Sequence, residues 1–293
     1  MPDRGRDLTF GWFLVPDASA PLVTLARDCE DRGLDLLGVQ DHPYQRRFVD
    51  TWALMGVVLG GTSRIRVFPD VASLPLRQPA TMAKAAASLD VLSAGRFELG
   101  LGAGAFWDAI EAYGGPRRTP GEALAALDEA IQLIRLVWSG ERNLRFAGAH
   151  YSLGGAQSGP VPAHDLGIWL GVYGPRALSL CGRVADGWVP SLRGEVSSLA
   201  AMTSRLDDAA AEAGRDPAEI RRVLNVNGTL RPAGAGSGGL LDGPVGQWVD
   251  ELADLALSLG FDTFVFGGDP ASMPAFAEEV APAVRARVAE ERV

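Results

Sequence analysis

His42 is the side chain in this sequence best suited to exchanging protons near neutral pH. The chain has three histidines, His42, His150 and His164, and His42 lies two residues after the apolar segment Leu34–Gln40, which predicts a strand. An unperturbed imidazole titrates at about 6.5 and can act as a general acid or base. Asp41 is the second catalytic candidate, although adjacent strand residues point to opposite faces. The alternative is a histidine that only satisfies backbone partners at the strand end.

A glycine-rich strand within Ser93–Ile110 predicts a place where a flat cofactor lies. Its bulky residues alternate with small or polar ones, and the small positions near its end are Gly100 and Gly102. Glycine inside a strand often marks close approach of a ligand or of another backbone. We therefore expect the cofactor against Gly100 and Gly102. Packing inside a barrel is the alternative, and a dinucleotide fingerprint (Gly100, Gly102, Ala105) is a weaker one because no helix opens directly after it.

Gly174-Pro175-Arg176 predicts a phosphate-binding turn. It follows the strand-like segment Ile168–Val172 and begins a helical pattern. The free N–H groups at a helix N-terminus attract anions, and Arg176 adds a positive charge. The alternative is that glycine and proline only start the helix.

Other kinds of chemistry lack a sequence signature. No HxH or HExxH pair predicts a metal site, so we expect no bound metal, and no GxSxG elbow is present. Cys29 and Cys181 lie on predicted helices and fit a reducing, cytoplasmic compartment. The net charge of −9 argues against nucleic acid, and no apolar run is long enough to span a membrane. A small-molecule enzyme that borrows its reactivity from an organic cofactor is the remaining prediction.

Eight strand-like segments, most of them followed by helical patterns, must position these residues. Alternating strands and helices predict a parallel sheet, and eight repeats predict an α/β fold with a single (β/α)8 TIM barrel over residues 1–293. An open doubly wound sheet is the alternative. Two long segments, 139–167 and the glycine-rich 231–243, predict insertion loops at the C-terminal face. The predicted strands are Leu8–Val15, Leu34–Gln40, Ile65–Asp70, Phe97–Gly102, Ile168–Val172, Gly187–Pro190, Val223–Gly228 and Thr263–Phe266.

Residues just past the strand ends build the site of such a barrel. By this rule the third strand contributes Asp70 and Val71, the fourth contributes Ala103 beside Gly102, and the fifth contributes Tyr173. These residues join the candidate cofactor-binding set.

Several motifs together resemble the bacterial luciferase-like superfamily of flavin- or F420-dependent barrel oxidoreductases. They are Asp41-His42, Leu74-Pro75-Leu76-Arg77-Gln78-Pro79, Asp90-Val91-Leu92-Ser93-Ala94-Gly95-Arg96, Leu99-Gly100-Leu101-Gly102-Ala103-Gly104, Gly174-Pro175-Arg176-Ala177 and Ala185-Asp186-Gly187-Trp188. The resemblance implies a tricyclic ring over the barrel mouth and a phosphate near Gly174–Arg176. It also implies that Asp41-His42 faces the ring, a non-prolyl cis peptide at Asp70–Val71, and a homodimer.

The resemblance favours coenzyme F420 and hydride transfer on a small organic substrate. An FMN-dependent monooxygenase that uses reduced flavin and oxygen is the alternative, and a non-catalytic flavin-binding protein is another. The sugar-phosphate dehydrogenases of this superfamily carry an acid where this chain has Ala105, and an aromatic residue where it has Arg46. A sugar phosphate is therefore not the expected substrate.

Overall fold

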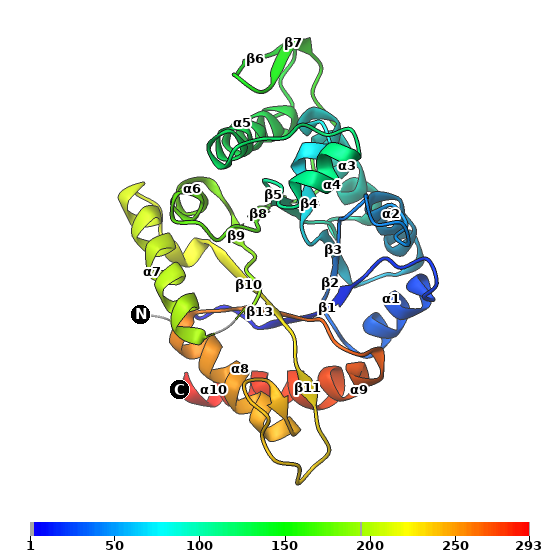
Figure 1. Ribbon diagram of the computed structural model, residues 1–293, viewed down its shortest axis with the longest axis vertical. Helices are drawn as coiled ribbons and strands as arrows, with labels where there is room; N and C mark the ends of the chain where they lie inside the picture. Colours follow the sequence, from blue (N-terminus) through cyan, green and yellow to red (C-terminus); the bar gives the residue numbers. More distant parts are fainter. Residues whose placement is uncertain (1–2, 194, 293) are drawn as a thin grey trace.

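The computed structural model describes residues 3–193 and 195–292, and these form a parallel barrel ringed by helices (Figure 1). The sheet order is β3-β2-β1-β13-β10-β9-β8-β5-β4, and all its pairs are parallel. A bridge between Val67 and Phe97 joins β3 to the chain entering β5, which closes the ring. The predicted (β/α)8 barrel is confirmed.

The strands agree closely with the predicted segments. The sixth predicted strand is short, and the third divides into β3 and β4 at a bend that contains the expected cis peptide Asp70–Val71. The barrel strands are β1 (Thr9–Leu14), β2 (Leu36–Val39), β3 (Arg66–Pro69), β4 (Ala72–Ser73), β5 (Leu99–Gly102), β8 (Ile168–Leu170), β9 (Gly187–Trp188), β10 (Arg221–Val226) and β13 (Thr263–Phe266).

The helices cover the outside of the barrel, and β11 (Thr229–Leu230) pairs with β12 (Asp242–Gly243) beside it. The α-helices are α1 (Leu22–Asp31), α2 (Thr51–Gly61), α3 (Pro79–Ser93), α4 (Trp107–Ala112), α5 (Pro120–Trp138), α6 (Pro175–Val184), α7 (Val196–Glu212), α8 (Val245–Leu259), α9 (Met273–Ala275) and α10 (Ala281–Glu291). Shorter turns are η1 (Leu74–Leu76), η2 (Pro217–Glu219), η3 (Pro270–Ser272) and η4 (Phe276–Val280). No helix among the described residues is long and apolar enough to cross a membrane.

Alternation along the strands divides the buried residues between two cores. One side of each strand packs against the helices, and the other side fills the barrel with a cluster of Leu36, Phe68, Trp169, Val189, Val223 and Val265. The barrel interior is therefore a packed core, and open space begins only at the C-terminal ends of the strands.

The insertion 139–167 differs from the prediction in both form and place. It contains an antiparallel hairpin, β6 (Leu144–Ala147) and β7 (Ser152–Ala156), which lies outside α5 in Figure 1. The segment begins where α5 ends and finishes where β8 begins, so both its ends lie at the N-terminal face of the barrel. Glu129 of α5 holds the hairpin tip by accepting the N–H groups of Ala149, His150 and Tyr151. Of the two predicted insertions, 231–243 is the one at the C-terminal face, where it follows β10 and β11.

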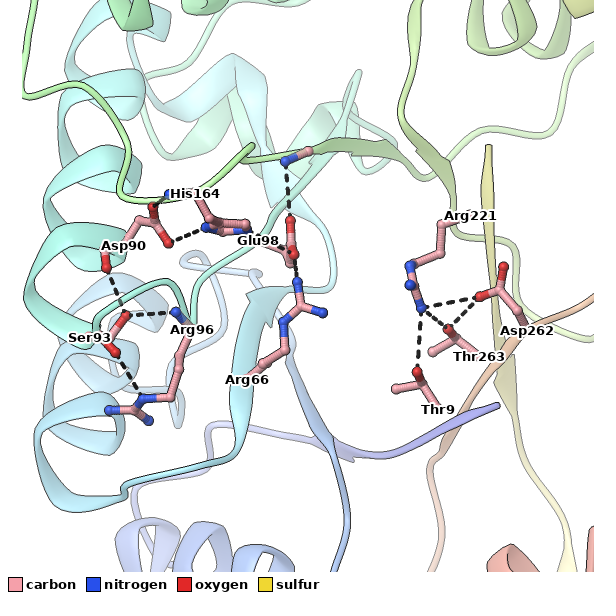
Figure 2. Close-up of polar contacts among 11 residues, drawn as sticks. Thr9, Arg66, Asp90, Ser93, Arg96, Glu98, His164, Arg221, Asp262 and Thr263 are labelled. Carbon is pink, nitrogen blue, oxygen red and sulfur yellow. Dashed lines mark hydrogen bonds and ion pairs between the residues drawn. The ribbon is translucent and has the colours of Figure 1, made fainter. Parts of the chain in front are cut away.

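Polar side chains hold the N-terminal end of the barrel together (Figure 2). His164 bonds Asp90 through Nδ1 (2.7 Å) and Glu98 through Nε2 (3.2 Å), and Glu98 also pairs with Arg66. Arg96 donates to the carbonyls of Leu59 and Ser93, among others. The motif Asp90–Arg96 therefore joins structural elements at the end of the barrel opposite the strand C-termini.

Candidate active site

A cavity of about 520 Å³ opens at the C-terminal ends of the barrel strands. Its lining includes eight of the residues expected in the site: Asp41, His42, Asp70, Val71, Gly102, Ala103, Tyr173 and Gly174. Three others, Gly100, Pro175 and Arg176, are not part of the lining. The ends of β2, β3, β5 and β8 bring the eight together, as parallel strands of a barrel must.

His42 stands at the wall of this cavity as a half-buried imidazole. Its Nδ1 lies 2.6 Å from the Tyr44 hydroxyl, and Phe106 packs edge-on to its ring at 5.2 Å. Burial lowers the pKa of His42 below its ordinary value, and the nearby Asp41 charge opposes that shift. Burial raises the pKa of Tyr44 to about 12, so its hydroxyl keeps its proton. At neutral pH the imidazole is therefore uncharged and can accept a proton.

Asp41 and His42 do not form a dyad. The Asp41 carboxylate is buried, where it accepts the Ser73 N–H at 3.0 Å and lies 3.6 Å from the Arg77 guanidinium. It thereby ties the end of β2 to β4. His42 turns instead toward Tyr44 and Phe106, as expected for adjacent residues that point to opposite sides.

The glycines of β5 make room for the bend at Val71. A side chain at Gly100 would meet the Pro69 carbonyl at 2.1 Å, and one at Gly102 would meet the Val71 side chain at 2.8 Å. Gly171 of the neighbouring strand is equally close to Val71. Gly100 thus serves the close approach of another backbone, whereas Gly102 and Val71 both face the cavity.

Asp70 and Asn225 form the polar part of the cavity floor. Asn225 Nδ2 donates to Asp70 Oδ1 at 2.9 Å, and each residue is only 8% exposed. Burial raises the pKa of Asp70 to about 7, although the hydrogen bond from Asn225 acts in the opposite direction. An isolated charge is costly in an apolar interior, so the carboxyl group keeps its proton up to neutral pH.

The N-terminus of α6 opens toward the same cavity. Gly174 is the residue that caps the helix, Pro175 occupies the first turn, and both Gly174 and Ala177 border the cavity. The N–H groups of the first turn have no partner within the helix and favour an anion. Arg176 lies on the exposed side of that turn.

The cavity lining also includes residues from outside the candidate cofactor-binding set. No helix was expected directly after Gly102, and the short helix α4 that begins at Trp107 brings Phe106 and Ile110 to the rim. Arg193 follows β9 and lies over the Tyr173 ring at 5.4 Å. Asn225 is a polar residue within the apolar run Val223–Val226 of the seventh predicted strand, and it also lines the cavity.

The residues fit a flat, anionic cofactor better than a metal. The wall at Gly102, Gly171 and Gly174 has no side chains, the floor carries a hydrogen-bonding pair, and a helix N-terminus borders the rim. Within residues 3–193 and 195–292, no three His, Cys, Asp or Glu side chains gather as metal ligands. Fold and site therefore define an α/β barrel of the kind that works with a ring cofactor.

The chain belongs to the luciferase-like monooxygenase family, whose model matches residues 8–233. An F420-dependent glucose-6-phosphate dehydrogenase from Nocardia farcinica is 31% identical over 232 residues, which are 75% of this chain and 68% of that protein. An F420-dependent hydroxymycolic acid dehydrogenase from Mycobacterium tuberculosis is 34% identical over 211 residues, which cover 68% and 56% of the two chains.

Solved structures share the fold at lower sequence identity. An F420-dependent secondary alcohol dehydrogenase in complex with an F420-acetone adduct superposes with a TM-score of 0.84 at 19% identity, over 95% of this chain and 99% of that one. The F420-dependent tetrahydromethanopterin reductase of Methanopyrus kandleri superposes with a TM-score of 0.81 at 18% identity, over 94% of this chain and 99% of that one.

Proposed function

We propose that this protein is an F420-dependent oxidoreductase that moves a hydride between the cofactor and a small organic alcohol or carbonyl compound. The observation that carries the proposal is the neutral, Tyr44-bonded His42 in the wall of a cavity shaped for a flat ring. The F420 dependence of the family relatives supports the choice of cofactor.

Each part of the cavity has a task in this proposal. The first turn of α6 would bind the cofactor phosphate, and Gly102 and Val71 would lie against the ring. When bound, the deazaflavin accepts or donates the hydride. His42 takes the hydroxyl proton as the alcohol is oxidised and returns it in the reverse direction. Phe106 and Ile110 at the rim exclude water from the substrate side.

The substrate we propose is uncharged. Ala105 lines the cavity without an acid, and Arg46 lies on the exposed loop after β2. The apolar rim formed by Phe106, Ile110 and Tyr44 suits an alkyl or aryl group next to the reacting carbon. Because the acid and the aromatic residue of the sugar-phosphate dehydrogenases are absent at these two positions, we do not propose a sugar phosphate.

Spectral titration of the apoprotein with F420 and, separately, with FMN tests the proposal. We expect saturable binding of F420, followed by loss of its oxidised absorbance when an alcohol is added. Tight binding of FMN with reduced-flavin-dependent oxygen uptake would support the monooxygenase alternative instead. Flavin binding without substrate-dependent redox change would indicate a binding protein.

The homodimer is also part of the proposal. Light scattering after size exclusion measures the mass directly, and a value for one chain at the assay concentration would contradict it.

A further inference from the structure

Two polar side chains interrupt an otherwise apolar barrel interior. Asp70 follows Phe68 by two positions along the chain, and Asn225 follows Val223 in the same way. Phe68 and Val223 belong to the interior cluster, so this alternation places Asp70 and Asn225 one layer higher, at the cavity floor. They are 155 residues apart in sequence and meet only across the barrel.

One side-chain oxygen of each residue in this pair has no hydrogen-bond partner among the described residues. Their mutual contact uses Asp70 Oδ1 and Asn225 Nδ2, whereas Asp70 Oδ2 and Asn225 Oδ1 are buried without a hydrogen-bond partner among the described residues. Buried polar atoms are rarely left unpaired in a folded protein, and each one calls for an explanation such as a catalytic role or a bound group. These two atoms therefore indicate that a polar ligand edge completes the floor.

The charged and titratable groups around Asp70 leave it without a counter-ion. From the end of β2 the cavity receives Asp41, His42 and Tyr44, from β8 Tyr173, and from β9 Arg193. Asp41 is held by Ser73 beside Arg77, His42 is bonded to Tyr44, and Arg193 covers the Tyr173 ring. Burial accordingly dominates at Asp70 and raises its pKa to about 7.

We propose that Asp70 is a proton-bearing cofactor ligand: as a neutral acid it donates a hydrogen bond to the polar edge of the bound ring, while Asn225 holds its second oxygen. This inference rests on the proposed function. A neutral carboxylic acid has one O–H donor, whereas the carboxylate only accepts. Ionisation of Asp70 removes that donor and sets a negative charge against the ring, so cofactor affinity falls as the pH rises through about 7.

Asp70→Asn is the matched variant, because an amide has the shape of the acid but stays uncharged. The probe is F420, titrated by absorbance from about pH 5 to about pH 9. We expect wild type and variant to bind alike at low pH. Above neutral pH the F420 affinity of the wild type should fall by roughly tenfold to a hundredfold relative to that of the variant. This is the expected effect of losing one charge-linked hydrogen bond. The ionisation of F420 itself affects binding to both proteins equally, so it cancels in the ratio of the wild-type and variant affinities.

Infrared spectra of the apoprotein supply a readout independent of F420. The wild type should show the carbonyl band of a protonated carboxylic acid, lost as the pH rises through about 7. The band should be absent in Asp70→Asn and retained in Asp41→Asn, which removes the other buried carboxyl of the cavity. Asp70→Ser provides a second uncharged variant if the amide prevents folding.

The outcomes separate this inference from the proposed function. Failure of the wild type to bind F420 contradicts the proposed function, and the infrared band still reports whether Asp70 is a neutral acid. Two results overturn the inference alone. One is F420 binding in which the ratio of the wild-type and variant dissociation constants does not change with pH. The other is a carboxylic acid band that survives in Asp70→Asn.

Discussion

The hydrogen bond between His42 and Tyr44 gives one imidazole nitrogen a fixed partner. Among the described residues Nδ1 has a hydrogen-bond partner, the Tyr44 hydroxyl at 2.6 Å. Nε2 has no hydrogen-bond partner among the described residues, and His42 lines the cavity. In the tautomer whose Nδ1–H donates to the Tyr44 oxygen, Nε2 can accept a proton. This arrangement also differs from the alternative suggested by the sequence, a histidine held by backbone groups, because the partner is a side chain.

His42→Ala should lower turnover by about 10²–10⁴-fold, the usual contribution of general acid–base help. Cofactor affinity and the thermal midpoint should stay near wild type, since the ring is half-buried at a cavity wall. Because burial lowers the pKa of His42, the neutral base persists below the ordinary histidine range. The wild-type rate should therefore stay level as the pH falls through about 6.5 and decline only below it. Steady-state rates across pH measure both effects.

Tyr44→Phe is the matched control, because it removes only the hydroxyl that contacts His42. It should shift the acid limb of the pH profile while retaining most of the turnover. Full activity in His42→Ala, or a variant that unfolds, would return His42 to a structural role.

At the scale of elements, α6 is the helix that we propose binds the cofactor phosphate. It starts at the rim with Gly174 as its cap, and it carries Arg176 in its first turn and Arg183 in its last. Its N-terminal end carries partial positive charge from unpaired N–H groups. The two arginines are both exposed and lie at opposite ends of one helix.

Arg176→Ala should weaken F420 binding by roughly 1–3 kcal/mol if its guanidinium contacts the phosphate. Fluorescence titration measures the dissociation constant. Arg183→Ala is the matched control and should leave affinity unchanged, because it lies at the far end of the helix. Equal affinities for both variants would limit the anion site to the backbone N–H groups of the turn.

Over the whole molecule, binding and structural polar groups lie at opposite ends of the barrel. The cavity occupies the C-terminal ends of the strands. At the other end, Asp90 accepts the N–H groups of Ala163 and His164 as well as the His164 side chain. Figure 2 shows His164 between Asp90 and Glu98. This network attaches the returning part of the insertion to α3 and β5.

His164→Ala should lower the free energy of unfolding by about 1–3 kcal/mol, because it leaves two buried carboxylates short of a partner. F420 affinity should be unchanged, since the network lies at the opposite end of the barrel. Urea unfolding and cofactor titration measure the two quantities. His150→Ala, at the hairpin tip, is the matched control and should be nearly neutral. A loss of affinity without a loss of stability would contradict this separation.

The sequence alone determined the barrel, the ends of its strands and the placement of His42 at the active end. Those features depend on local periodicity, since alternation of apolar residues and the residue that stops each strand are written in consecutive positions. The capping box at Thr119 and Glu122 is local in the same way, because each side chain bonds the backbone of the other residue.

Only the tertiary structure decided which of these residues share a surface. Gly100 and Gly102 look equivalent in sequence, but the bend at Pro69–Val71 covers one and leaves the other at the cavity. The insertion 139–167 could not be assigned to a face before the end of α5 was placed. The Asp70–Asn225 contact spans 155 residues and exists because eight strands close with one particular register. Partners across a closed barrel are set by that closure, which no stretch of consecutive residues encodes.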